Sequence, residues 1–339
     1  MTCARIAMGV AFLTVGCSGL RAQSNPDALQ LGKPLSLKMD RPVLDIAVSP
    51  NGQIVAVGSE AGLQLLRADN LRPISRLDGS KGNAAAIAFS ANSKIVATVG
   101  EDRHPSFWSA DDGRLLNTAI EKRWGWRVEA HNSLLQCLTS GGNPAISKWN
   151  MVSGELMQEV QTDFDHMGAI TMLPSGKQFI SCGVYRNQKS SRYKMELRDY
   201  ASLKPIRVLQ EAKNQVFAMS ISPDGSKLGF VTQNGSAEIW DLKSLSPLHE
   251  TQLDQTKTTK LHFLPDGRSV VVAGWFRKLV VWDFVGGDVR ELKYPSSGGL
   301  TSMAYLRSPD RLLLGSGQAD FRLALAEVQS KGRIAMSPR

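Results

Sequence analysis

The chain has 339 residues, of which 42% are hydrophobic, and its formal net charge at pH 7 is +9. This length and apolar fraction suffice for a large core, which excludes a chain too small or too polar to fold alone. There is no Cys-x-x-Cys pair and the five histidines are scattered, so we expect no metal site.

The N-terminus predicts export. Residues 1–22 contain no acidic side chain, and Ile6–Gly16 is an apolar run of eleven residues, too short to span a bilayer permanently but typical of a secretory signal. Two kinds of processing remain open: cleavage after Ala22, or a lipoprotein signal that ends before Cys17, which would then be lipidated. In either case we expect residues 23–33 to be a linker and the protein to be periplasmic or extracellular, with membrane contact only through a lipid anchor.

A repeating unit of short strands occupies the rest of the chain. In its clearest copies, Ser222–Gly225 precedes Ala237–Asp241, and Leu264–Gly267 precedes Leu279–Asp283. Each copy is a Pro-Asp-Gly turn with a Trp-Asp pair whose Trp stands 15 residues after the turn glycine. The turn position recurs at Gly52, Ser93, Leu134, Gly176, Gly225, Gly267 and Arg311. The Trp position recurs at Arg67, Trp108, Trp149, Arg198, Trp240, Trp282 and Ala324.

Both series advance in steps of 41 to 49 residues, a period typical of propeller blades. A β-sandwich, the rival all-β fold, would not require the spacing of 15 that five of the seven units share. Strands are predicted in the first and fifth repeats at Val43–Ser49, Ile54–Gly58, Leu63–Arg67, Val216–Ser222, Lys227–Thr232 and Ala237–Asp241. We therefore predict one all-β domain at 34–339, a seven-bladed β-propeller of four-stranded antiparallel blades. An early strand, Pro34–Met39, or a late one, Arg333–Ser337, should close the ring.

The turn and the Trp-Asp pair resemble the WD-repeat family of seven-bladed propellers over roughly residues 40–330. The resemblance is degenerate, because Trp-Asp itself stands only at residues 240–241 and 282–283, and the family's Asp six residues before the Trp survives only as Asp102. It implies a monomeric scaffold in which most of the family's rigidifying hydrogen bonds are missing and burial has to supply the stability.

Two cysteines, Cys137 and Cys182, lie beyond the expected signal and on the second strands of the third and fourth repeats. A disulfide would be permitted in an oxidising compartment but needs strict geometry. We expect two separate buried thiols.

The fourth repeat carries an insertion. Its step from Gly176 to Arg198 is 22 residues instead of 15, and the surplus falls in a predicted loop at 184–194 with four cations, two tyrosines and no acid. In a propeller, such loops share a face with the loops that lead into the innermost strands. Aromatic side chains beside arginines are typical binding anchors. We predict a partner-binding surface on this face, here called the basic aromatic rim, made of Arg103, Lys122, Arg123, Trp124, Arg186, Lys189, Arg192, Tyr193, Trp275, Phe276, Arg277 and Lys278. The structural alternative is that Trp124 and Trp126 pack between blades and the insertion is merely tolerated.

An enzyme is the alternative function. Exported propellers include lactonase-like hydrolases and quinone-dependent dehydrogenases, with their chemistry at the central channel. Such a site needs a general acid or base there, and the candidates are Glu101, Asp102, His104, Asp165 and His166, with residues 163–166 as the best small cluster.

The sequence as a whole favours a non-enzymatic, exported scaffold. Its positive charge indicates an acidic partner, and we expect a protein or peptide. Nucleic acid is not expected as a partner outside the cytosol, no cofactor is implied, and we expect a monomer.

Overall fold

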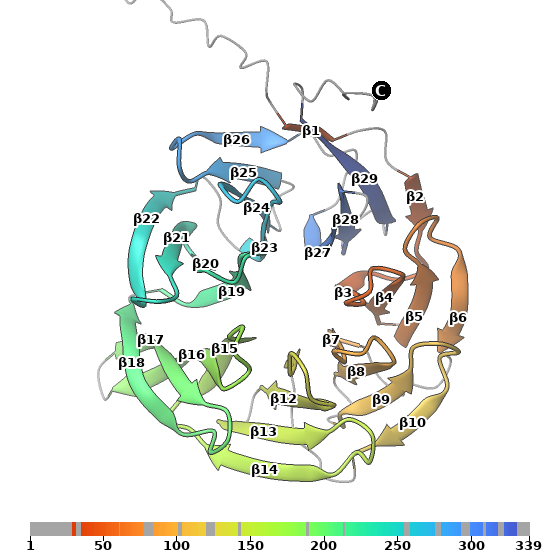
Figure 1. Ribbon diagram of the computed structural model, residues 1–339, viewed down its shortest axis with the longest axis horizontal. Helices are drawn as coiled ribbons and strands as arrows, with labels where there is room; N and C mark the ends of the chain where they lie inside the picture. Colours follow the sequence, from red (N-terminus) through yellow and green to blue (C-terminus); the bar gives the residue numbers. More distant parts are fainter. Residues whose placement is uncertain are drawn as a thin grey trace, which may run out of the picture.

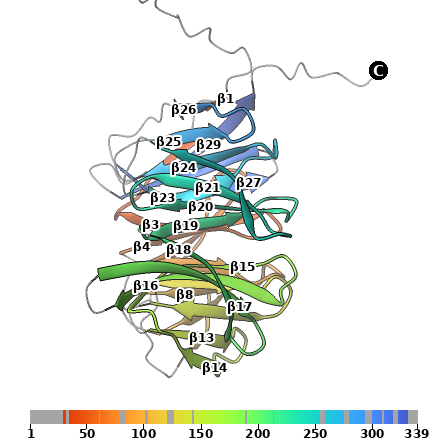
Figure 2. The ribbon, with the colours of Figure 1, turned by 90° about the vertical axis from the view of Figure 1, so that its left-hand side faces the viewer.

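The computed structural model describes residues 29–31, 35–60, 62–77, 84–100, 104–119, 126–141, 144–187, 190–212, 214–253, 258–274, 279–292, 299–307, 310–317 and 322–330. These residues form seven antiparallel sheets arranged as the blades of a ring, as Figure 1 shows along the ring axis and Figure 2 from the side. The predicted seven-bladed β-propeller is therefore confirmed.

In blades 1 to 6 the strands run in chain order from the central channel outward, and in blade 7 the strands β27 to β29 do so before the N-terminal strands complete the outer edge. Blade 1 contains β3 (Val43–Val48), β4 (Ile54–Ser59), β5 (Gly62–Arg67) and β6 (Pro73–Leu77), and blade 2 contains β7 (Ala86–Phe89), β8 (Ile95–Val99), β9 (Ser106–Ser109) and β10 (Leu115–Thr118). Blade 3 contains β11 (Arg127–Ala130), β12 (Gln136–Ser140), β13 (Ala145–Asn150) and β14 (Leu156–Gln161), and blade 4 contains β15 (His166–Met172), β16 (Gln178–Asn187), β17 (Ser190–Asp199) and β18 (Pro205–Ala212). Blade 5 contains β19 (Val216–Ile221), β20 (Lys227–Thr232), β21 (Ser236–Asp241) and β22 (Ser246–Gln252), and blade 6 contains β23 (Thr258–Phe263), β24 (Ser269–Gly274), β25 (Leu279–Asp283) and β26 (Val289–Leu292). Blade 7 contains β27 (Leu300–Arg307), β28 (Asp310–Ser316) and β29 (Arg322–Ser330), with β1 (Leu29–Leu31) and β2 (Leu35–Lys38) on its outer edge.

The strands predicted in the first and fifth repeats are confirmed to within one residue at each end. The turn chemistry explains why the boundaries were readable. Gly225, for example, has φ = +71°, a conformation that favours glycine, and its N–H donates to the carbonyl of Ser222 at 2.9 Å.

The ring closes through the N-terminal strand, as predicted for Pro34–Met39. β2 pairs with β29 from Leu35 opposite Leu325 to Lys38 opposite Arg322. The late alternative, Arg333–Ser337, lies outside the described residues. The linker prediction for 23–33 is wrong for β1, because Leu29–Leu31 extends the same closure along β29 and satisfies that strand's outer edge.

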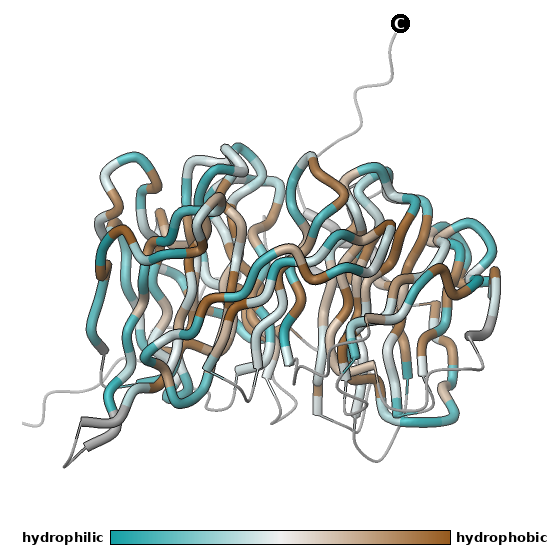
Figure 3. Tube along the Cα trace, turned by 90° about the horizontal axis from the view of Figure 1, so that it is seen from below, coloured by the Kyte–Doolittle hydropathy of each residue, from teal (hydrophilic) through white to brown (hydrophobic). Residues whose placement is uncertain are grey.

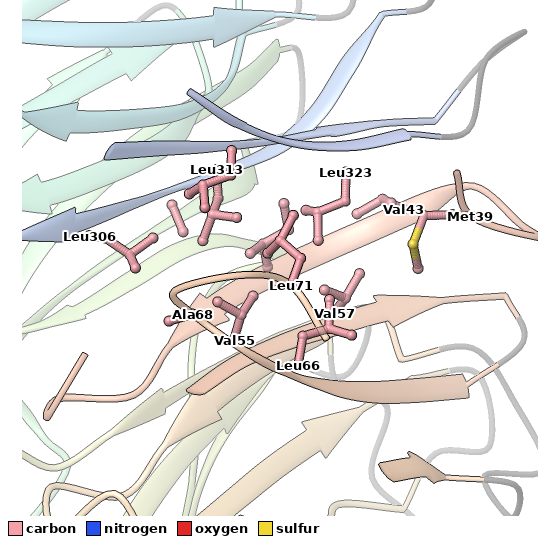
Figure 4. Packing of buried hydrophobic residues seen from close by; sticks show 13 residues of the cluster. Met39, Val43, Val55, Val57, Leu66, Ala68, Leu71, Leu306, Leu313 and Leu323 are labelled. Atoms are coloured by element: carbon pink, nitrogen blue, oxygen red, sulfur yellow. The ribbon is translucent and has the colours of Figure 1, made fainter. Parts of the chain in front are cut away.

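The core lies between the blades rather than within them. Each of seven apolar clusters in the described part of the chain draws its members mainly from two neighbouring blades. Figure 4 shows the cluster between blades 7 and 1, where Val43 and Val55 face Leu313 and Leu323. In Figure 3 hydrophobic stretches run through the interior of the blades, between more hydrophilic turns. Stacking of neighbours therefore buries the faces that a single blade would expose.

Tryptophans at the repeat position are buried and hydrogen-bonded within their own blades. The indole Nε1 of Trp108 donates to the hydroxyl of Thr98 at 3.0 Å, and that of Trp149 donates to Thr139 at 2.8 Å. Neither indole is more than 4% exposed. These two blades thus combine burial, which the sequence led us to expect as the main source of stability, with one hydrogen bond each.

The two cysteines behave as predicted. Cys137 packs between blades 2 and 3 and Cys182 between blades 4 and 5, and both are free. Burial raises the pKa of both thiols, which makes them poor nucleophiles.

In the described part of the chain, no helix has the length and apolar character needed to cross a membrane.

Candidate functional site

Most of the predicted basic aromatic rim lies outside the described residues, and so does Cys17. This holds for Arg103, Lys122, Arg123, Trp124, Lys189, Trp275, Phe276, Arg277 and Lys278. The backbone of Arg186 and the whole of Arg192 and Tyr193 are described, and all three residues belong to blade 4. The rim remains a prediction, and the fourth blade is the part of it that can be examined.

The fourth-blade insertion is not a loop. β16 and β17 continue pairing to Asn187 opposite Ser190, so the surplus residues lengthen two strands into a hairpin, here called the fourth-blade hairpin (Gln178–Asp199; Figure 2). The run was interpreted as a loop because its composition is polar, yet its described residues, 184–187 and 190–194, all have cross-strand partners. Tyr193 pairs in register with Val184, and β18 follows it outward as far as Ala212.

Acidic residues from neighbouring segments pair with two of the hairpin cations. Arg192 lies 3.5 Å from Glu211 of β18, and these two side chains are 56% and 53% exposed. Lys194 pairs with Asp163, in the segment that precedes β15, and with Glu196 at 2.7 Å. The exposed pair contributes little stability because water competes for it, so Arg192 can exchange its partner at low cost.

A buried row of charges runs along one face of β17. Lys194, Glu196 and Arg198 alternate in sequence and therefore project to the same side of the sheet. One oxygen of the Glu196 carboxylate meets Lys194, and the other accepts from Nη2 of Arg198 at 2.5 Å. Arg198 is 2% exposed, occupies the Trp position of its repeat, and also donates to Ser181 and to the carbonyl of Leu203. We call these three residues the β17 charge ladder; it fixes the base of the hairpin.

The central channel contains a cavity of about 640 Å³ that is lined by residues from the innermost strand of every blade. Most of its lining is apolar or small. Three charged residues line it at equivalent positions, because Asp45, Arg127 and Lys260 each stand seven residues before the turn position of their own repeat. Alanines occupy this position in blades 2, 4 and 5, at Ala86, Ala169 and Ala218.

Two of these charges pair across blade 7. Lys260 Nζ lies 2.7 Å from Asp45, and the same carboxylate accepts from the hydroxyl of Ser302 at 2.9 Å and from the N–H of Ile87 at 3.0 Å. Asp45 therefore links blades 6, 7, 1 and 2 at one point. Its hydrogen-bonding capacity is largely used by the protein itself.

Glu129 and Arg127 form a second polar group in the cavity, on β11. Oε1 of Glu129 accepts from the N–H of Met172 at 3.0 Å and from the hydroxyl of Thr171 at 3.4 Å. Burial raises the pKa of Glu129 to about 7, with these hydrogen bonds and Lys260 opposing the shift. Burial also lowers the pKa of Arg127, which nevertheless remains charged at neutral pH.

His262 is the remaining titratable group of the cavity lining. Its Nε2 lies 2.9 Å from the carbonyl of Met303, which makes this nitrogen the donor. Burial lowers the pKa of His262 to about 4, so the ring is neutral at physiological pH.

The described catalytic candidates of the alternative function do not line this cavity. His104, Asp165 and His166 are absent from its lining, while Glu101 and Asp102 lie outside the described residues. Nδ1 of His104 is 2.8 Å from the carbonyl of Ala119, and Asp165 and His166 are exposed. No group of histidine, cysteine and carboxylate side chains suited to a metal ion exists among the described residues.

The polar residues that line the cavity were not found from the sequence. The available signal was a charged residue inside an otherwise apolar innermost strand, repeated at one fixed distance from the turn. Asp45, Arg127 and Lys260 share that distance, and Glu129 and His262 follow two residues after the last two of them.

Comparison with known proteins supports a repeat propeller. No family model matches the chain. It is 22% identical over 289 residues to eukaryotic translation initiation factor 3 subunit I of Lodderomyces elongisporus, covering 78% of this chain and 79% of that protein. It is 21% identical over 228 residues to target of rapamycin complex subunit wat1 of Schizosaccharomyces pombe, covering 63% and 69%. It is 25% identical over 172 residues to a WD repeat-containing protein 91 homolog of Dictyostelium discoideum, covering 49% and 22%.

Proposed function

Because the chain is a degenerate member of the WD-repeat family of seven-bladed propellers, we propose that it is an exported scaffold that binds an acidic protein or peptide through the basic aromatic rim. A role as a protein-interaction scaffold accords with the relatives, two of which are named as subunits of larger assemblies. The proposal adds three points to the scaffold role: the ligand is acidic, it binds at the basic aromatic rim, and the protein is exported.

The observation that carries the proposal is the fourth-blade hairpin. Its strands have ten residues each, longer than any other in the described part of the chain, and the extension adds cations rather than core. Among the described residues, the ion pair that holds Arg192 is the exposed one with Glu211. A partner carboxylate can replace Glu211 with little loss of stability, and a surface of exchangeable cations speeds encounter with an acidic ligand.

Capture from the native source tests this function. The wild-type chain is compared with a variant in which Arg186, Lys189 and Arg192 are changed to Glu, leaving the β17 charge ladder intact. The matched control carries three Lys→Glu changes at exposed positions in turns at the opposite ends of the strands, at 94, 177 and 204. We expect a protein captured by the wild type and the control but lost by the rim variant. Equal capture by all three would refute the rim.

Export is tested separately. The mass of the mature protein from secreting cells should correspond to cleavage after Ala22 or to a lipidated Cys17. A Cys17→Ser change distinguishes the two, because it abolishes lipid labelling only if Cys17 is the modified residue. Full-length protein retained inside the cell would contradict export.

A further inference from the structure

The central cavity holds two opposite charges that do not pair with each other. Arg127 and Glu129 are two residues apart on β11, and both line the cavity. Side chains at this spacing point to the same side of a strand, with Cα atoms about 7 Å apart. Two long side chains at this spacing can reach each other, but Arg127 and Glu129 do not form an ion pair in the described part of the chain.

Each of the two groups is held in place by a different neighbour. Nη1 of Arg127 donates to the carbonyl of Trp126 at 2.9 Å, which leaves most of the five guanidinium N–H groups for another acceptor. Oε1 of Glu129 accepts from blade 4, at Met172 and Thr171, which leaves Oε2 for another donor. The hydrogen bonds therefore keep the cation and the anion apart and leave both with bonding capacity.

The other charged groups of the cavity offer less to a ligand. Lys260 is neutralised by Asp45, whose two oxygens accept from three protein donors. The ring of His262 is neutral, and its Nε2 is used by Met303. The rest of the lining includes Leu44, Ile87, Ile170, Phe217 and Leu261, which provide an apolar wall. A volume of about 640 Å³ lies within the range of small-molecule sites.

We propose that the central cavity binds a small zwitterion with an apolar side chain, of one or two amino-acid residues, whose carboxylate meets Arg127 and whose ammonium meets Glu129. Such a ligand supplies an anionic partner for Arg127 and a cationic partner for Glu129, and its apolar side chain contacts the apolar wall. A ligand with only one charge leaves one of these half-buried ionic groups without a partner, which is costly in a partly desolvated site. The site is independent of the basic aromatic rim.

Isothermal titration calorimetry with the full chain at pH 8, above the pKa of about 7 of Glu129, tests the proposal with this carboxyl group mostly ionised. The probes are L-phenylalanine and L-leucyl-L-phenylalanine, each compared with its N-acetyl form, which lacks the ammonium, and with its C-terminal amide, which lacks the carboxylate. We expect at least one zwitterion to bind and both singly charged forms to bind about tenfold more weakly or worse. No binding of either zwitterion, or equal binding of the singly charged forms, would overturn the proposal. Because the comparison is made on the wild-type chain, it does not depend on how any variant folds.

Two variants assign each end of the ligand. Glu129→Gln keeps an oxygen that accepts from Met172, so we expect it to fold, and it should bind the N-acetyl form as well as the zwitterion. In the same way, the Arg127→Met variant should bind the C-terminal amide and the zwitterion with equal affinity. Discrimination that survives unchanged in a folded variant contradicts the assigned contact. Loss of protein capture by the rim variant is a separate readout, so either proposal can fail without the other.

Discussion

Replacing Glu196 by glutamine tests whether the β17 charge ladder stabilises the fourth blade. Glu196 is 3% exposed and lies between Lys194 at 2.7 Å and Arg198 at 2.5 Å. The change removes the only carboxylate that pairs with Arg198 among the described residues, while Lys194 keeps Asp163. Removal of one partner from a buried ion pair typically costs about 3–5 kcal/mol, because the other charge stays buried without compensation. We expect a loss of about 3 kcal/mol in the free energy of unfolding.

The measurement is urea unfolding followed by tryptophan fluorescence. Asp111→Asn is the matched control: it breaks the Lys94–Asp111 pair, also close at 3.1 Å but with side chains 61% and 64% exposed, and should cost less than about 1 kcal/mol. A double variant, Glu196→Leu with Arg198→Trp, replaces buried charge by apolar bulk and restores the residue found at this position in other blades. It should recover most of the loss. A Glu196→Gln chain as stable as the control would refute the reasoning.

Three further outcomes are expected. The pKa of Glu129 is raised from 4.5 in the unfolded chain to about 7 in the folded chain, so the wild type should lose stability relative to Glu129→Gln as the pH rises through this interval. Urea unfolding at pH 5 and pH 8 should show a relative loss of up to about 3 kcal/mol in the free energy of unfolding. Parallel pH profiles of the two chains would contradict this prediction. Among the described residues, the charged or titratable groups that line the same cavity as Glu129 are Arg127 on its own strand, Lys260 and His262 on β23 and Asp45 on β3. Leu37→Asp in β2 should lower the free energy of unfolding by about 2 kcal/mol, because Leu37 packs against the cluster between blades 7 and 1. An unchanged midpoint of urea unfolding would argue against closure through β2. Trp275→Ala should weaken the complex with a captured partner by about 2 kcal/mol, mainly through faster dissociation in surface plasmon resonance, and unchanged kinetics would remove this residue from the rim.

The fold could be predicted because turn and strand chemistry repeat at a fixed spacing. Gly225 has a left-handed conformation in the turn before β20, and Trp240, 15 residues later, is buried in the neighbouring strand β21. These two residues therefore locate the pair of strands in the sequence. The need to cover the last edge strand predicted closure by either residues 34–39 or residues 333–337, and the pairing of β2 with β29 shows closure through the first of these. The partners of individual charges were not readable, since Glu211 and Asp163 reach the hairpin cations only through the arrangement of strands.

The channel illustrates the same limit. Asp45 and Lys260 are 215 residues apart in sequence and form an ion pair because the ring brings blades 6 and 1 to either side of blade 7. Conversely, residues that are neighbours in sequence need not reach the channel. Asp165 and His166 are adjacent in sequence, but the start of β15 places them on an exposed end of blade 4 rather than in the cavity lining.

The most direct test of the scaffold account is crosslinking mass spectrometry on the complex with a captured partner. Lys94, Lys177 and Lys204 are exposed in turns at one end of the strands, and the predicted rim also contains lysines, so the comparison is internal to one sample. The account predicts crosslinks from the partner to Lys122, Lys189 and Lys278 on the basic aromatic rim. Crosslinks confined to Lys94, Lys177 and Lys204, on the opposite turns, would contradict it.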